Sequence, residues 1–226
     1  MPETPGNAEH QLGKDVEKAE LVLGAPRWYS RGYLPHFDSK EKIQSITFRL
    51  ADSLPQEKLK QLEAQLDLTP DDQRDLKKRK TIEQWLDSGL GCCALKHPDV
   101  AGTVQNSLLR FDGDRYKLLA WCIMPNHVHA VIEPSECLGK IVQSWKSYTG
   151  RWAMERNAKL VLGVPGRRFW MREYWDRYIR NENHLESVIQ YIHQNPVSAG
   201  LCKSPEQWQW SSAYPGNAEH QLGNHR

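Results

Sequence analysis

Two histidines stand one residue apart in Met124–Pro134, whose sequence is MPNHVHAVIEP. Alternate residues of a β-strand face the same side, so His127 and His129 can present two imidazoles to one metal ion. Val128 and Ala130 would then face the other way. With nine histidines in 226 residues, a pair at this spacing also arises by chance. Taken alone, the pair therefore leaves open two unrelated surface histidines.

Tyr148 lies within Leu138–Arg156, a segment whose apolar residues recur at helical spacing. A phenol needs activation to act as a nucleophile, because its ordinary pKa is about 10. A metal ion beside it could help by polarising the phosphate that it attacks. Tyr148 lies at the edge of the apolar stripe of this helix. The alternative is therefore a boundary tyrosine with a buried ring and a solvated hydroxyl.

The stretch Leu138–Arg180 concentrates positive charge that the net charge of +2 conceals. It holds ten basic and three acidic residues, a balance of +7, while the rest of the chain carries −5. Eight of the 21 aromatic residues also fall in this stretch. Arginine binds phosphate through a bidentate fork, and aromatic faces stack on unpaired bases. This combination indicates a nucleic-acid-binding face. A merely solvated basic surface would not explain so many aromatic residues between the arginines.

The elements that must position these residues mix strands and helices without a regular alternation. Period-2 patterns and apolar, β-favouring runs predict strands at 43–50, 116–124 and 127–132, the last two joined as a hairpin. Helical spacing and capping residues predict helices at about 59–66, 70–86, 138–156 and Asn183–Asn195, where Pro196 would stop the last one. This order favours an α+β fold with an antiparallel sheet.

Both ends of the chain carry the same nine residues, PGNAEHQLG, at 5–13 and 215–223. The copies lie too far apart for a solenoid repeat. Their Gly, Pro, Asn and Glu content predicts flexible tails over 1–27 and 215–226, around one catalytic domain at 28–214. Codons for the shared Ala-Glu-x-x-Leu-Gly can include GCCGAGC and GCTCGGC, which are reverse complements. We therefore hypothesise that the reading frame runs through copies of a DNA repeat that can fold into a hairpin.

Export and membrane insertion are not expected from the sequence. No apolar run approaches the roughly 20 residues of a membrane span. The first residues also lack the basic segment followed by an apolar segment that is typical of a secretory signal peptide. The five cysteines form neither a disulfide framework nor a zinc pattern. These features predict a cytoplasmic location with reduced thiols and without a membrane partner.

Together these segments resemble the REP-associated tyrosine transposases, single-strand DNA nucleases of the His-hydrophobic-His, single-tyrosine superfamily. The resemblance covers about 28–214 and rests on the order and spacing of four motifs. They are MPNHVHAVIEP at Met124–Pro134, KSYTGR at Lys146–Arg151, the stretch Phe169–Leu201, and WQWSSAY at Trp208–Tyr214. The resemblance implies a ferredoxin-like antiparallel sheet with helices packed on one face.

By matching positions, the resemblance implies that His127 and His129 bind Mg²⁺ or Mn²⁺ and that Tyr148 is the nucleophile. In such enzymes the tyrosine attacks a single-stranded DNA phosphate, which leaves a 5′-phosphotyrosine and a free 3′-hydroxyl, and the reverse reaction rejoins strands. A hard cation suits this chemistry because it positions the phosphate and offsets its charge. Relatives often supply a third ligand one turn after the tyrosine. That position here is Trp152, which cannot bind a metal, so the third ligand is unassigned.

The resemblance also implies a partner, single-stranded or hairpin DNA, bound by a monomer or a homodimer in the nucleoid of a bacterial cytoplasm. The residues expected to contact DNA are Lys146, Arg151, Arg167, Arg168, Trp170, Arg172, Arg177, Arg180 and Asn195. Two alternatives to a transposase stay open. One is a domesticated relative that binds hairpin DNA without cutting it, which Trp152 would suit. The other is a histidine-triad nucleotide hydrolase, which Val131 disfavours because that pattern needs a third alternating histidine.

Overall fold

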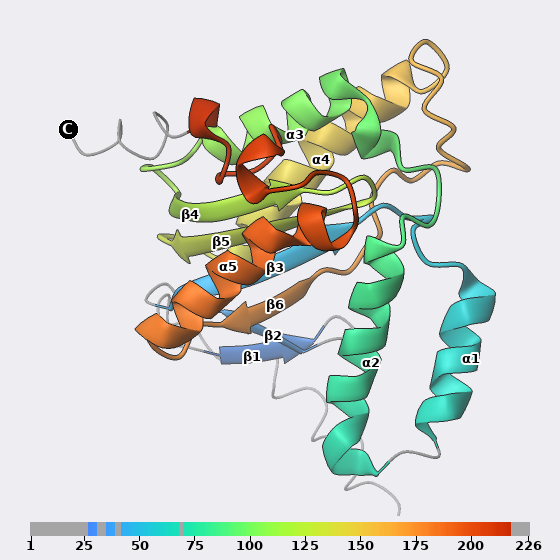
Figure 1. The fold of residues 1–226 in the computed structure, drawn as a ribbon, viewed down its shortest axis with the longest axis vertical. Helices are drawn as coiled ribbons and strands as arrows, with labels where there is room; N and C mark the ends of the chain where they lie inside the picture. Colours follow the sequence, from blue (N-terminus) through green and yellow to red (C-terminus); the bar gives the residue numbers. More distant parts are fainter. Residues whose placement is uncertain (1–26, 31–34, 39–41, 68–69, 218–226) are drawn as a thin grey trace, which may run out of the picture.

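The computed structural model describes residues 27–30, 35–38, 42–67 and 70–217. Its centre is a four-stranded antiparallel sheet in the order β4-β5-β3-β6 (Figure 1). The strands are β3 (Gln44–Arg49), β4 (Tyr116–Ile123), β5 (His127–Pro134) and β6 (Trp175–Tyr178). With helices α3 and α4 as crossovers, they form the βαββαβ unit of ferredoxin-like folds. The expected α+β fold and antiparallel sheet are confirmed.

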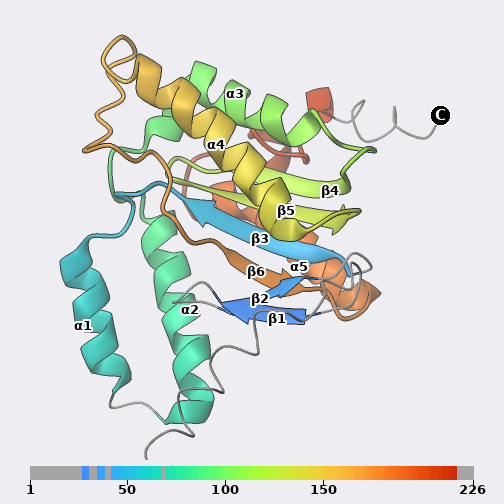
Figure 2. The same cartoon turned by 180° about the vertical axis from the view of Figure 1, so that it is seen from behind.

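Five helices accompany this sheet in the part of the chain that is described: α1 (Gln56–Leu66), α2 (Asp71–Asp87), α3 (Pro98–Leu109), α4 (Leu138–Arg156) and α5 (Glu182–Ser198). None of them is long and apolar enough to cross a membrane. A small antiparallel hairpin of β1 (Arg27–Ser30) and β2 (Pro35–Asp38) contacts β6 through β2 (Figure 2). The three predicted strands and four predicted helices are confirmed. The β1–β2 hairpin, α3 and β6 were not predicted.

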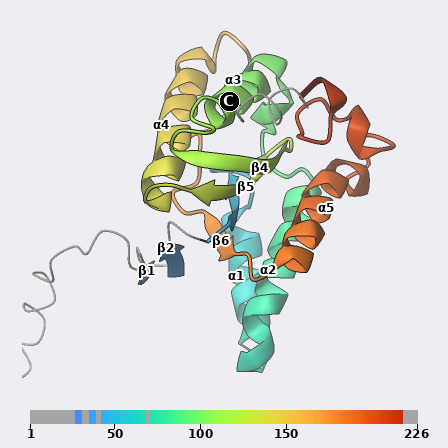
Figure 3. The ribbon, with the colours of Figure 1, turned by 90° about the vertical axis from the view of Figure 1, so that its left-hand side faces the viewer.

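The two faces of the sheet carry different helices. Phe48, Val128 and Ala130 belong to the core cluster shared with α3 and α4, whereas Cys122 and Val131 alternate to the other face and pack with α5. Figure 3 shows α4 and α5 on opposite sides of the sheet. The expectation of helices on one face holds for α3 and α4 and is wrong for α5. The reason is that β4 and β5 are buried on both faces and need a second cover.

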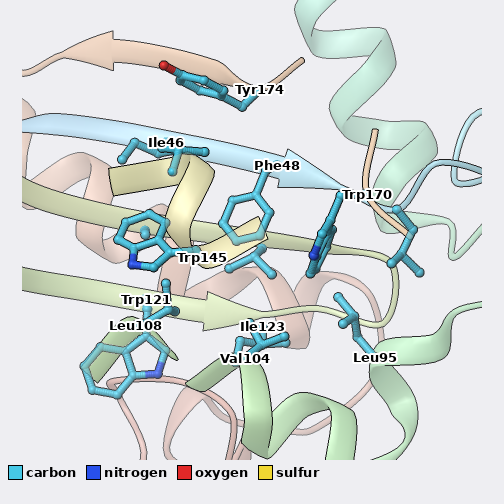
Figure 4. Packing of buried hydrophobic residues seen from close by; sticks show 14 of the residues in the cluster. Ile46, Phe48, Leu95, Val104, Leu108, Trp121, Ile123, Trp145, Trp170 and Tyr174 are labelled. Atoms are coloured by element: carbon cyan, nitrogen blue, oxygen red, sulfur yellow. The ribbon is translucent and has the colours of Figure 1, made fainter. Parts of the chain in front are cut away.

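An aromatic core fixes α4 against its face of the sheet. The Trp145 Nε1 donates to the Tyr116 hydroxyl at 2.9 Å, and that hydroxyl donates to the Leu108 carbonyl at 2.6 Å. The rings of Phe48 and Trp170 pack in a T-shaped arrangement with their centroids 4.9 Å apart (Figure 4). These contacts join α3, α4, β3 and β4. The core therefore fixes the position of α4.

The second copy of the terminal repeat begins inside the fold. Pro215–Asn217 forms a short 3₁₀ turn, and Asn217 is buried. Its Nδ2 donates to the carbonyls of Gln209 and Ser211 at 3.0 and 2.8 Å, and its Oδ1 accepts from Gln105. The prediction of a flexible tail from residue 215 is therefore wrong for residues Pro215–Asn217. The remainder of this copy and the N-terminal copy lie outside the described residues.

Helix α5 begins and ends differently from the sequence expectation. Its N-cap is Asn181 rather than Asn183, because the Asn181 side chain accepts from the His184 N–H at 2.9 Å. Pro196 does not stop the helix, which continues to Ser198. The helix ends where Gly200 adopts a φ of +70°, a left-handed conformation that glycine reaches without a Cβ clash. Residues on both sides of Pro196 therefore share one helix.

Candidate functional site

The two histidines of β5 face α5 and meet in a buried position. His127 and His129 are 1% and 3% exposed, and their Nε2 atoms lie 2.9 Å apart with the ring planes perpendicular. Two ligands at right angles around a cation with bonds of about 2.0–2.1 Å are separated by about 2.9 Å. The pair is therefore spaced like neighbouring ligands of one octahedral cation.

Asn126 determines which nitrogen of His127 can bind a metal. The Asn126 Oδ1 lies 2.8 Å from Nδ1 of His127, and its Nδ2 donates to the Leu90 carbonyl at 2.9 Å. An amide oxygen only accepts, so Nδ1 of His127 carries the proton and Nε2 presents a lone pair. Burial and the adjacent His129 hold the pKa of His127 well below its ordinary value, which keeps the ring neutral. Thr47, opposite His129 on β3, bonds Nδ1 of His129 at 2.9 Å.

The tyrosine that stands beside this pair is Tyr191 of α5. Its ring centroid lies 5.9 Å from that of His129, with the planes at 79°. α5 packs on the same face of β4 and β5 through Ile192, and Tyr191 remains 42% exposed. A phenol accessible to solvent therefore stands at the edge of the histidine pair.

Tyr148 lies on the other side of the sheet. α4 packs through Ile141 and Trp145 on the face that carries Val128 and Ala130, whereas the histidine side chains alternate to the α5 face. The Tyr148 side chain is 58% exposed. The expectation that Tyr148 acts beside the histidines is therefore corrected. The cause is the βαββαβ topology, which holds this crossover helix on the face opposite the metal-ligand candidates.

Asn195 follows Tyr191 by one helical turn and so lies on the same face of α5. It is 2% exposed, and its Nδ2 has no hydrogen-bond partner among the described residues. A side-chain amide offers an oxygen of the kind that hard cations prefer. The polar position one turn after the tyrosine is thus filled by Asn195 rather than Trp152, which packs on the core under Arg156. Asn195, which was predicted to bind DNA, therefore lies on the helix that carries Tyr191.

A carboxylate of α2 approaches the histidines from a third element. The Asp87 Oδ1 lies 3.7 Å from Nε2 of His127. Burial, and secondarily the charge of Glu83, raise the pKa of Asp87 to about 6. Over the ranges that the structure describes, no group of three or more histidine, cysteine, aspartate or glutamate side chains is arranged to hold a metal ion in this structure.

Most of the predicted DNA-binding residues converge on a groove between α4 and the segment 167–174. The groove encloses about 470 Å³, and no acidic side chain lines it in the described part of the chain. The predicted residues that line it without being part of the core are Lys146, Arg151, Arg167, Arg168 and Arg172. The Lys146 Nζ donates to the Arg172 carbonyl at 2.6 Å, which ties the two walls together. The structure thus gathers these five cations in one concave surface.

Besides Asn195, three predicted DNA-binding residues lie elsewhere or have another role. Trp170 is 6% exposed and its Nε1 donates to the Thr149 hydroxyl at 2.9 Å, so its ring has no free face for a base. The core requires this indole, which corrects its predicted role. Arg177 lies on β6 and Arg180 just after it, outside the residues that line the groove.

The residue that sequence reasoning missed is Tyr191. The signal was present, because Tyr191 borders the apolar stripe of Val188, Ile189 and Ile192 and precedes Asn195 by one turn. Sequence periodicity does not reveal which face of a sheet a helix covers. Only the fold shows that α5, and not α4, covers the histidine face.

Part of the chain is similar to known transposases. Residues 109–195 match the family described as "Transposase IS200 like". A Haemophilus influenzae protein provisionally named a REP-associated tyrosine transposase is 25% identical over an alignment of 108 residues, which covers 43% of this chain and 58% of that protein. A second, uncharacterized protein of that organism is 26% identical over 33% of this chain and 51% of its own length. The chain spans a little over half the length of these curated relatives.

Two solved structures are also similar. One is described as the REP-associated tyrosine transposase bound to a REP hairpin, with a TM-score of 0.45, 17% identity, and coverage of 81% of both chains. The other is a provisionally named transposase of Deinococcus radiodurans, with a TM-score of 0.32 and 14% identity. It covers 74% of this chain and 96% of its own.

Proposed function

Because residues 109–195 match the IS200-like transposase family, we propose that this chain cuts and rejoins single-stranded DNA beside hairpins, with Tyr191 as the nucleophile. The observation that carries this proposal is the 5.9 Å contact between the rings of Tyr191 and His129. It brings an accessible phenol to two convergent imidazoles on one face of the sheet. Tyr148 lies on the face of the sheet opposite the two histidines.

The proposed reaction forms a bond between the Tyr191 oxygen and the phosphorus of a DNA phosphate. The bond from phosphorus to the 3′ oxygen breaks, the phenol gives up its proton, and the leaving oxygen takes one to become a 3′-hydroxyl. The resulting 5′-phosphotyrosine conserves the phosphoester bond, so the reverse attack rejoins strands without an external energy source.

The donor set fits a divalent cation, because His127 and His129 supply two converging imidazole nitrogens and Asn195 supplies a buried amide oxygen on the helix that carries Tyr191. When bound, Mg²⁺ or Mn²⁺ would offset the negative charge that develops on the phosphate oxygens. A polar residue one turn after Tyr191 also removes the reason to favour a protein that binds hairpins without cutting. That alternative rested on Trp152.

We propose that the groove beside α4 holds the hairpin DNA. Its wall joins the sheet at Met171, whose N–H donates to the Arg49 carbonyl at 2.9 Å, and Arg49 is the cross-strand neighbour of His127. A strand that leaves the groove at this end of the sheet would pass to the opposite face to reach the histidine pair. The five cations of the groove would neutralise phosphates along that path.

A labelled single-stranded hairpin with flanking sequence tests this function. The gene's own DNA that encodes the repeated segment is the first probe. With Mg²⁺ or Mn²⁺, the protein should form an adduct that survives denaturation and retains a 3′ label, while a 5′-labelled fragment is released with a free 3′-hydroxyl. A fully paired duplex of the same sequence is the control. An adduct that retains the 5′ label instead would contradict the proposed polarity.

Arg168→Ala is expected to weaken hairpin binding and to make it less sensitive to salt. Each lost phosphate contact lowers the slope of log affinity against log salt concentration by about 1, because fewer counterions are released. Fluorescence anisotropy at several salt concentrations measures this slope. Lys117→Ala, which removes an exposed cation of β4 outside the groove, is the matched control. Equal slopes for both variants would contradict a binding role for the groove.

Asn126→Ala is expected to weaken Mn²⁺ binding roughly 10–100-fold, because the His127 ring loses the acceptor that fixes its tautomer. Titration followed by the electron paramagnetic resonance of free Mn²⁺ measures the affinity. Asn126→Asp keeps the acceptor and should lose less. An Ala variant with unchanged affinity would show that His127 is not held for a metal by this bond.

A further inference from the structure

Asp87 is a charged group beside the histidine pair that has no role in the proposed reaction. It is the last residue of α2, and its Oδ1 lies 3.7 Å from Nε2 of His127. That oxygen is buried and has no hydrogen-bond partner among the described residues. A buried carboxylate oxygen without a donor is costly, so its position calls for a cationic partner.

His127 is not a satisfactory hydrogen-bond partner for this oxygen. A separation of 3.7 Å is too long for a hydrogen bond. The ring proton of neutral His127 is on Nδ1, where Asn126 accepts it, so Nε2 has no hydrogen to donate. Nε2 of His127 and Oδ1 of Asp87 are thus two acceptors that converge. Convergent acceptors without a shared proton are what a metal ion binds.

Two independent contacts hold Asp87 at this place. The preceding residue, Leu86, is 2% exposed in a small core with Ile82 and Leu54, so the end of α2 is packed. The turn after Asp87 is tied to the site by Leu90, whose carbonyl accepts from Asn126 Nδ2. Asn126 therefore binds the His127 ring with one amide atom and the Asp87 turn with the other.

We propose that Asp87 is an additional ligand of the divalent cation held by His127 and His129, supplied by α2 through its Oδ1. The inference rests on the metal site of the proposed function and extends it with a fourth donor. The other three donors are neutral, and Mg²⁺ and Mn²⁺ favour oxygen ligands that include carboxylates. A carboxylate from α2 therefore supplies both the charge and the donor type that two imidazoles and one amide lack.

Mn²⁺ binding to the full-length protein without DNA tests this ligand by a measurement other than activity. Asp87→Asn is expected to lower the affinity at least tenfold, whereas Asp87→Glu keeps a carboxylate and should retain more affinity than Asn. Glu83→Gln removes a negative charge one turn earlier on α2 and is the matched control. It should bind Mn²⁺ nearly as the unmodified protein does.

The outcomes separate this inference from the proposed function. If Asp87→Asn binds Mn²⁺ as tightly as the unmodified protein while His129→Ala does not, the metal site stands and Asp87 is not a ligand. Equal losses in the Asp87→Asn and Glu83→Gln variants would reduce the effect to charge and overturn the assignment. If the unmodified protein binds no Mn²⁺, the metal part of the proposed function fails together with this inference. Thermal melting in a chelator shows whether each variant is folded.

Discussion

Tyr191→Phe is expected to abolish the covalent adduct with hairpin DNA, whereas Tyr148→Phe leaves it. The substitution removes only the hydroxyl and keeps the ring that lies 5.9 Å from His129. Loss of a nucleophile lowers cleavage by roughly three orders of magnitude or more, because no neighbouring group replaces it. Denaturing electrophoresis of labelled adducts compares the two variants directly, since each loses one phenol oxygen.

Hairpin binding separates a chemical defect from a structural one in this comparison. Tyr191→Phe should bind the hairpin with nearly unchanged affinity, because the groove cations lie on the α4 side of the sheet. An adduct that persists in Tyr191→Phe and disappears in Tyr148→Phe would return the nucleophile to α4. Such a result would require α4 to reach the histidines of another molecule.

His129→Ala is expected to lower cleavage about 10²–10³-fold and to leave hairpin binding in the groove unchanged. The substitution removes one of two buried imidazoles whose Nε2 atoms lie 2.9 Å apart. A cation that polarises a phosphate contributes several kcal/mol to the transition state, which corresponds to a loss of about this size. Rates measured under single-turnover conditions with Mg²⁺ or Mn²⁺ give the comparison.

Chelation should reproduce this loss and should not add to it. EDTA is expected to slow the unmodified protein as strongly as His129→Ala does, and to have little further effect on that variant. His193→Ala is the matched control. His193 also lies on α5, but its Nε2 forms a hydrogen bond of 2.7 Å with the Ser212 hydroxyl instead of facing the histidine pair. A His129→Ala variant with full, EDTA-sensitive activity would place the metal elsewhere.

The sheet and the histidine pair were accessible to sequence reasoning because their signals are local. Alternation at Ile46 and Phe48 marked β3, and the one-residue spacing of His127 and His129 set both rings on one face. α4 was found from its apolar stripe, which includes Trp145. In each case a short stretch of residues contains the whole pattern.

The partners of the histidines were not accessible in the same way. Tyr191 and Asp87 reach the pair from helices that lie 62 residues after His129 and 40 residues before His127 in the chain. Which face of the sheet a helix covers follows from the connections of the whole βαββαβ unit. Likewise, composition located the basic stretch, but it did not show that the core uses Trp170.

Identification of the peptide that carries the DNA tests the central claim most directly. After trypsin and nuclease digestion of the adduct, mass spectrometry distinguishes two peptides that each contain one tyrosine: 181–203 with Tyr191, and 147–151 with Tyr148. The nucleotide remnant is predicted on Tyr191 in peptide 181–203. A remnant on peptide 147–151, or on any other tyrosine of the chain, would contradict the assignment of α5 as the catalytic helix.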